Sequence, residues 1–334
     1  MSFRRPAWLE LLLIGFVAIA SAGCGDDATA PNDSPRLTIL DPESTLVAPR
    51  NSQITFSATA TDTEDGDLSE DIIWVSDLAG ELGTGGDIAV VLEPGVHNVT
   101  ARVTDSQGET VTATTSLEVS QVEANGFTPE INALVPDSLI AAMEDLGMPI
   151  ARGPDPPALE AAFLVSPFVL TASSVPGDSP GFRFPDYYVE YSRLDPDSLT
   201  LDIDWVNGPS RAEGIGGLIV GEDGRFSIFS TSTATLAGAV ATILEVHTGT
   251  IGIDGLEDFH TAVFMLDNQG NPGGVFIPEA TGRVGRDDDA FSPEIDGIPA
   301  AASTSISAGA SARRVPALLS CDPRKLRSEL ARVE

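Results

Sequence analysis

The chain has 334 residues, with 50 Asp and Glu against 18 Lys and Arg, which gives a formal net charge of −32. This length suggests about two domains, each large enough to bury its own core. The acidic charge disfavours nucleic acid and anionic lipid as partners and attracts divalent cations and positively charged groups, and the alternative for most of these charges is a solvated, self-repelling surface that needs no partner. Cys24 and Cys321 lie near opposite ends of the chain, so neither a disulfide framework nor a CxxC zinc site is expected.

The first 23 residues are typical of a secretory signal peptide. Arg4 and Arg5 precede an apolar stretch at 11–20, and small residues follow before Cys24. The apolar stretch is shorter than the roughly 20 residues that span a bilayer as a helix. We therefore predict an exported chain from which residues 1–23 are removed.

The sequence Ala22-Gly23-Cys24 resembles the lipobox of bacterial lipoproteins. The resemblance implies that Cys24 is diacylated and becomes the new N-terminus, and that residues 24–36 form a polar tether. With Gly25 after the cysteine, it also implies a place in the bacterial outer membrane, facing the periplasm or the cell surface. The alternative is ordinary signal peptidase cleavage after Ala22, which leaves Cys24 as a free thiol.

From residue 37 to 119, apolar and polar residues alternate with a period of two, and turn-forming clusters interrupt the alternation. This pattern predicts a β-sandwich. The segments ATATDTEDGD (58–67), IIWVSDLAGELGTG (72–85) and GVHNVTARVTDSQGET (95–110) resemble PKD-like and related immunoglobulin-like domains of secreted bacterial proteins. For residues 37–121 the resemblance implies this fold, with Trp74 buried. It implies no particular function, because such modules serve as spacers, adhesins or carbohydrate-associated appendages.

Acidic side chains crowd one turn of the predicted sandwich and leave two interpretations open. Calcium prefers six to eight oxygen ligands, at roughly 2.3 to 2.6 Å, and carboxylates at this density suit it. The alternative is an acidic hairpin tip in which Gly66 supplies the turn. Apart from calcium, no cofactor is expected. The candidate calcium ligands are Asp62, Glu64, Asp65, Asp67 and Asp105.

Residues 122–157 are predicted to be a linker with one short helix. Pro136 and Asp137 favour a helix start, and Gly147 and Pro149 favour its end, so we place the helix at 136–146. Apolar residues repeat along one face of this segment, and we expect that face to pack on the domain that follows.

Residues 158–290 are predicted to form an antiparallel, eight-stranded, barrel-like domain. Successive strands joined by tight turns give one continuous sheet, and a large sheet with one apolar face must curl or split to bury it. The up-and-down order is similar to lipocalin-type barrels in pattern only. The whole chain is therefore predicted to be all-β. The predicted strands are 161–172, 182–191, 199–206, 214–220, 225–233, 239–249, 258–266 and 275–284.

A group of aromatic residues in this domain could bind a ligand or fill its core. Tyr187, Tyr188 and Tyr191 are the chain's only tyrosines, and Trp205 lies on the next predicted strand. Exposed together, these rings could stack on a sugar or line an apolar pocket. The alternation of Tyr187 and Tyr191 with Tyr188 favours a barrel core.

Catalytic patterns are weak in this sequence. Asp202 and Asp204 share one face of a predicted strand and could serve a polysaccharide hydrolase if they faced a cleft, although such a pair is more often the solvent side of a strand. His97, His247 and His260 fall in three separate strands without zinc-binding spacing, and ordinary strand positions are expected for them.

Residues 291–334 are predicted to be a disordered tail with a short basic helix after Asp322.

The function we predict is a non-catalytic, lipid-anchored envelope protein, in which the immunoglobulin-like spacer presents a ligand- or partner-binding barrel. The alternative is a secreted polysaccharide hydrolase. The expected partners are the membrane, through the lipid anchor, and a carbohydrate, a small apolar ligand or an envelope protein.

Overall fold

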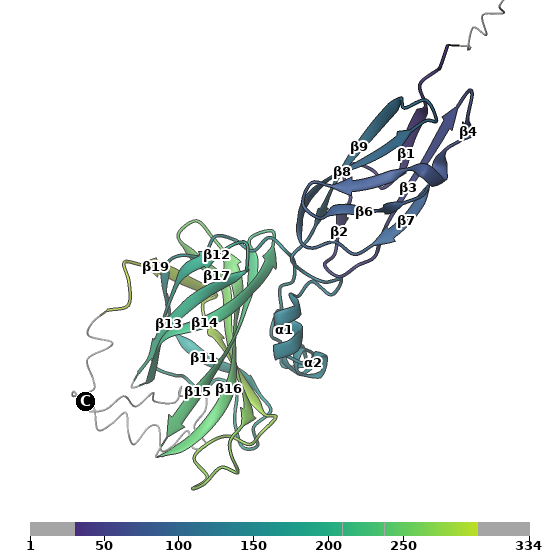
Figure 1. The fold of residues 1–334 in the computed structure, drawn as a ribbon. Helices are drawn as coiled ribbons and strands as arrows, with labels where there is room; N and C mark the ends of the chain where they lie inside the picture. The colour runs from purple at the N-terminus through teal and green to yellow at the C-terminus, as the bar shows by residue number, and fades with distance from the viewer. Residues whose placement is uncertain (1–30, 209, 237, 300–334) are drawn as a thin grey trace, which may run out of the picture.

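In the computed structural model, residues 31–208, 210–236 and 238–299 are described. They form two β-rich lobes with two short helices between them (Figure 1). The predicted all-β fold class is confirmed. The predicted signal peptide, Cys24 and Cys321 lie outside the described residues, as does most of the predicted tail.

The first lobe is a sandwich of two sheets. Its alternating strands bury one face each: in β3 the buried positions include Phe56 and Ala58, and the intervening positions are more exposed. One sheet contains β1 (Arg36–Asp41), β3 (Ile54–Asp62), β4 (Gly66–Asp67) and β7 (Asp87–Val90). The other contains β2 (Val47–Ala48), β5 (Ile73–Ser76), β6 (Gly80–Thr84), β8 (Gly95–Thr104) and β9 (Thr110–Val119).

Trp74 lies at the centre of the sandwich, as predicted. It is fully buried, its ring centroid is 5.4 Å from that of Phe56 on the opposite sheet, and its indole N–H donates to the Gly85 carbonyl at 2.9 Å. A buried indole needs such an acceptor because an unpaired N–H in the core is costly.

Two helices follow the sandwich, α1 (Pro129–Leu134) and α2 (Asp137–Asp145). The sequence analysis predicted α2 and missed α1, although Thr128-Pro129 is a helix-start signal: the Thr128 hydroxyl accepts from the Ile131 N–H at 3.2 Å. As expected, the helices pack on the second lobe, because Ile131, Ile140 and Met143 belong to its core.

The second lobe is one 10-stranded antiparallel sheet that closes on itself. Neighbouring strands pair in sequence from β12 to β17, and then β17 pairs with β19, β19 with β10, and β10 with β12. The hydrogen-bonded ladder therefore returns to its start, as the predicted barrel requires. The strands are β10 (Ala162–Val165), β11 (Phe168–Ser173), β12 (Tyr187–Asp195), β13 (Thr200–Asn207), β14 (Ser210–Glu222), β15 (Arg225–Leu236), β16 (Ala239–Ile251), β17 (Gly255–Asp267), β18 (Gly282–Asp287) and β19 (Phe291–Ile295).

Three details of the predicted barrel were wrong. The expected strand 161–172 is broken at Ser166-Pro167 into β10 and β11, because proline cannot donate to a ladder. The expected strand 275–284 begins only at Gly282. Residues 291–295, which were assigned to the disordered tail, form β19 and close the sheet between β10 and β17.

No helix among residues 31–208, 210–236 and 238–299 is long and apolar enough to cross a membrane.

Candidate functional site

The centre of the barrel holds a hydrogen-bonded group of polar side chains. His247 on β16 lies between two tyrosines of β12: its Nε2 is 3.0 Å from the Tyr187 hydroxyl, and its Nδ1 is 2.9 Å from the Tyr191 hydroxyl. All three side chains are at least 97% buried. Both ring nitrogens of a buried histidine are thus satisfied by hydroxyl groups, which can donate or accept.

Glu245 lies beside His247 on the same face of β16 and is also buried. The Trp205 indole N–H donates to its Oε2 at 3.2 Å, and its Oε1 is 3.7 Å from His247 Nε2. Burial raises the pKa of the Tyr187 and Tyr191 hydroxyls well above the ordinary value, and the nearby Glu245 adds to the effect. Both tyrosines therefore stay protonated at neutral pH.

Aromatic rings fill the space around this polar centre. Phe259 stacks on Tyr187 at 6.4 Å, and Phe226 meets Tyr191 edge-on at 6.3 Å. Three of the four predicted ligand-binding residues, Tyr187, Tyr191 and Trp205, are thus brought together as core side chains. Tyr188 points to the other face of β12 and is half-buried. Ligand binding by these residues stays a prediction, and their packing fits the core alternative.

The roles of His247 and Glu245 were not predicted from the sequence. The signal available was weak: a Glu-x-His pair with a period of two, which places both side chains on one face of a strand. His97 has a comparable structural role in the sandwich, where its ring nitrogens contact the Ser76 hydroxyl at 2.9 Å and the Glu93 carbonyl at 2.8 Å.

A buried ion pair ties β18 to the loop that follows β11. Arg283 contacts the Asp178 carboxylate through Nε at 2.6 Å and through a terminal nitrogen at 2.9 Å. The two side chains are 3% and 5% exposed. Burial alone would raise the pKa of Asp178, but hydrogen bonds from Arg283 and Ser173 outweigh it, so this pKa lies below its ordinary value.

Asp202 and Asp204, the carboxylates proposed for a hydrolase, lie on the outer face of β13, opposite the buried Leu201 and Ile203. Asp202 pairs with Arg193. Asp204 accepts a hydrogen bond from the Gly214 N–H. Two carboxylates on an outer face, each already bonded, do not form the facing pair that glycosidases use.

The predicted calcium ligands gather at one tip of the sandwich, where each carboxylate accepts at least one hydrogen bond. Asp62 Oδ1 accepts from the N–H groups of Glu64 and Asp65, at 2.9 and 3.0 Å. Asp65 accepts from the backbone and the hydroxyl of Ser106, both at 2.8 Å. Asp105 accepts from the side-chain amide of Asn32 at 2.8 Å, which lowers its pKa. The Asp62 bonds are typical of an Asx turn, whereas those from Ser106 to Asp65 and from Asn32 to Asp105 join segments that are distant in sequence.

The two remaining candidate ligands are engaged in the same way: Glu64 accepts from the Asp33 N–H at 3.4 Å, and Asp67 from the Ser69 N–H at 3.0 Å. In the described part of the chain, no three His, Cys, Asp or Glu side chains form a group that could hold a metal ion. A calcium site here stays a prediction.

The outer surface of the barrel carries an acidic groove of about 560 Å³. It lies where β10, β12 and β19 meet the turn between β16 and β17. Its carboxylates come from four separate segments of the chain, and Ile253 at its edge is 99% exposed. We define the acidic groove by the carboxylates of Glu160, Glu190, Asp254, Glu294 and Asp296.

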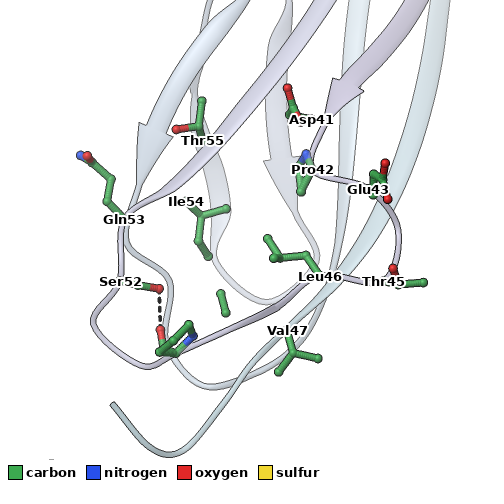
Figure 2. Close-up of a pocket in the computed structure, with 12 residues that line it drawn as sticks. Asp41, Pro42, Glu43, Thr45, Leu46, Val47, Ser52, Gln53, Ile54 and Thr55 are labelled. Carbon is green, nitrogen blue, oxygen red and sulfur yellow. Dashed lines mark hydrogen bonds between the residues drawn. The ribbon is translucent and has the colours of Figure 1, made fainter. Parts of the chain in front are cut away.

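A second hollow, of about 710 Å³, lies in the sandwich, where the chain leaves one sheet after β1 and joins the other as β2. Figure 2 shows Leu46 pointing toward Ile54 across it, while Gln53 points away. Asp41 and Glu43 are the two carboxylates that line this hollow, against five in the acidic groove, so we take the acidic groove as the stronger candidate.

No protein-family model and no curated protein matches the chain. Among solved structures, one is from a study of the promiscuous specificity of carbohydrate-binding modules of the β-sandwich superfamily. It is 14% identical, with 81% of this chain and 95% of that chain covered, at a TM-score of 0.26.

Two further similar structures come from Bacteroides. A lipoprotein of Bacteroides thetaiotaomicron is 11% identical over 75% of this chain and 100% of its own, with a TM-score of 0.20. A protein of the mixed-linkage glucan utilization locus of Bacteroides ovatus, solved with a mixed-linkage heptasaccharide, is 11% identical over 70% of this chain and 65% of its own, with a TM-score of 0.23. At these TM-scores the likenesses say nothing about function.

Proposed function

We propose that this is a non-catalytic, lipid-anchored protein of the bacterial outer membrane, in which the sandwich is a rigid spacer and the barrel binds a partner. The observation that carries the proposal is the junction between the lobes, which is hydrogen-bonded on both sides. Residues 31–36, which follow the proposed anchor, lie at the end of the sandwich that points away from the barrel (Figure 1). The spacer therefore holds the barrel away from the anchored end.

Glu123 is the centre of this junction. Its carboxylate accepts from the side-chain amide of Asn51 in the sandwich at 2.7 Å, and from that of Asn132 in α1 at 2.6 Å. A backbone hydrogen bond also crosses the junction. The Arg50 N–H donates to the carbonyl of Val122, whose side chain is part of the barrel core. A loose linker has no such bonds to either domain.

The next residues fasten the junction to the barrel. Phe127 meets Phe229 of β15 edge-on at 5.7 Å, and the Arg152 guanidinium lies 4.9 Å from the Phe127 ring centroid. The Gly153 N–H donates to the Gly126 carbonyl at 3.0 Å. The burial of Phe127, together with the contacts of Arg152 and Gly153, favours a single orientation of the two lobes over a range of orientations.

The acidic groove is the surface we assign to the partner. Its carboxylates favour positively charged groups, and they can also accept hydrogen bonds from sugar hydroxyls. A carbohydrate and an envelope protein therefore remain the proposed partner classes. A small apolar ligand in the barrel centre is disfavoured, because aromatic side chains occupy that space. The hydrolase alternative has no support from Asp202 and Asp204, which lie on the outer face.

The rigidity of the junction can be tested by pulsed electron–electron double resonance, which measures the distribution of distances between spin labels on the two lobes. Labels at the exposed positions Thr112 and Thr233, in a chain that starts at residue 25 and carries Cys321→Ser, should give one narrow distance distribution. Glu123→Ala removes the side-chain hydrogen bonds to Asn51 and Asn132 and should broaden the distribution. The control is Glu118→Ala, an exposed carboxylate of β9 outside the junction, which should leave the width unchanged. A broad distribution in the unmutated chain would rule out a rigid spacer.

A further inference from the structure

The carboxylates of the acidic groove lack a positive counter-charge in the described part of the chain. None of the five forms an ion pair there, although Arg152, Arg183, Arg193, Arg211 and Arg283 each pair with a carboxylate elsewhere. Glu160 accepts only the Leu194 N–H, at 3.1 Å. Like charges held together in a hollow repel one another and concentrate cations, so the groove favours a positively charged occupant.

The groove also offers apolar contact. Ile253 stands at its edge almost completely exposed, and Ala161, Ala162 and Ile295 contribute to the lining. An exposed isoleucine beside carboxylates without ion pairs suits an occupant that carries both basic and apolar side chains. The basic side chains can pair with the carboxylates, and the apolar ones can cover Ile253.

The chain's own C-terminal segment has this composition and starts at the rim of the groove. Gly297 lines the groove, and the chain continues for residues 300–334 beyond the described part. That stretch contains six of the chain's 18 Lys and Arg, interspersed with Val and Leu. The basic residues are Arg313, Arg314, Arg324, Lys325, Arg327 and Arg332.

Chain length permits the contact. Lys325 lies 28 residues after Gly297 in the sequence, and a flexible chain of that length has a root-mean-square span of about 30 Å. A tethered segment of this kind meets a site near its attachment point at an effective concentration of about a millimolar, which makes weak ionic contacts sufficient.

We propose that the basic C-terminal segment, residues 313–332, binds in the acidic groove of its own chain and neutralises its carboxylates. Bound there, the segment covers the surface that we assign to the partner, so a cationic partner must displace it. The inference thus adds intramolecular regulation to the proposed function, and the contact itself does not depend on the identity of the partner.

Lys325 is the only lysine in the chain, which makes the contact measurable. A carbodiimide joins carboxylates directly to amines, so long-range cross-links to Lys325 in the mature chain report what lies beside it. We expect these links to map to the groove, and to fall at least fivefold between about 20 mM and about 500 mM salt, because high ionic strength screens exposed charge pairs.

A triple variant tests whether the groove is the receptor. With Glu190→Gln, Asp254→Asn and Glu294→Gln, the links from Lys325 to the remaining groove carboxylates should also fall at least about fivefold. A control with Asp197→Asn, Glu222→Gln and Asp223→Asn removes exposed carboxylates at two turns and at the end of β14, all outside the groove, and should leave the links unchanged. Equal melting temperatures of both variants show that the fold is intact.

Two results would overturn the proposal. The first is a set of Lys325 links spread over exposed carboxylates without preference for the groove. The second comes from mixing equal amounts of ¹⁵N-labelled and unlabelled protein: if about half of the Lys325 links join a labelled to an unlabelled chain, a second copy is the source of the segment. Either result leaves the rigid spacer untouched, because spin-label distances across Glu123 test that separately.

Discussion

His247→Ala should destabilise the barrel by about 4 kcal/mol, one of the two largest effects we expect from a single substitution. The change leaves the hydroxyls of Tyr187 and Tyr191 without their partner in a core that water does not reach, and it opens a cavity. Urea unfolding followed by Trp205 fluorescence, in a Trp74→Phe background, measures the loss in the barrel. An effect below about 1 kcal/mol would mean that the polar centre does not stabilise the barrel.

Two further variants separate this effect from simple loss of a histidine. His260→Ala is the matched control, because His260 lies on the outer side of β17 and its ring hydrogen-bonds only the Asp258 carbonyl, at 2.8 Å, in the described part of the chain. It should cost less than about 1 kcal/mol. The triple variant Tyr187→Phe, Tyr191→Phe and His247→Leu removes every hydroxyl that the histidine satisfied. It should recover part of the lost stability, because no hydroxyl is left without a partner, while Glu245 remains buried with its bond from the Trp205 indole.

Arg283→Met should destabilise the barrel by about 3 to 5 kcal/mol at neutral pH, because it leaves the Asp178 carboxylate buried without its counter-charge. Adding Asp178→Leu removes that stranded charge and should restore most of the stability. Arg183→Met is the control. Its partner Asp288 is 3.7 Å away and both side chains are exposed, so the loss should stay below about 1 kcal/mol.

The pH dependence of the Arg283 effect has a definite sign. In the folded chain the pKa of Asp178 is lowered, so the pair's contribution is present at neutral pH and is lost as the pH falls through that folded pKa. The difference in unfolding free energy between the wild type and Arg283→Met should therefore shrink in acid. Urea titrations at neutral pH and below the ordinary Asp pKa check this, and a difference that grows in acid would contradict the assigned ion pair.

The fold was largely predictable because its strands alternate clearly and its turns contain Gly, Asp, Asn and Pro at the expected places. The exceptions are local. β19 was not predicted, because Pro293 and two carboxylates in or beside it have low β-strand propensity. Its strand conformation depends on pairing with β10 and β17. Strand 161–172 was read as continuous because its apolar run hides the break at Pro167.

Neither the polar centre nor the acidic groove could be predicted from the sequence, for different reasons. In β16 the residues around His247 are buried on both faces, because the segment after α2 covers the outside, where Thr248 donates to the Pro149 carbonyl at 2.7 Å. Alternation therefore could not show which face points inward. The groove combines four segments whose sequence separation gives no sign that they meet.

Metabolic labelling with a fatty-acid analogue tests the lipid anchor, on which the placement of the whole protein depends. The full-length chain should incorporate the label, and Cys24→Ser should not, because the predicted acceptor is the thiol of Cys24. Mass spectrometry should then find a mature N-terminus at a diacylated Cys24. Equal labelling of both chains, or a mature N-terminus at Gly23, would contradict the account.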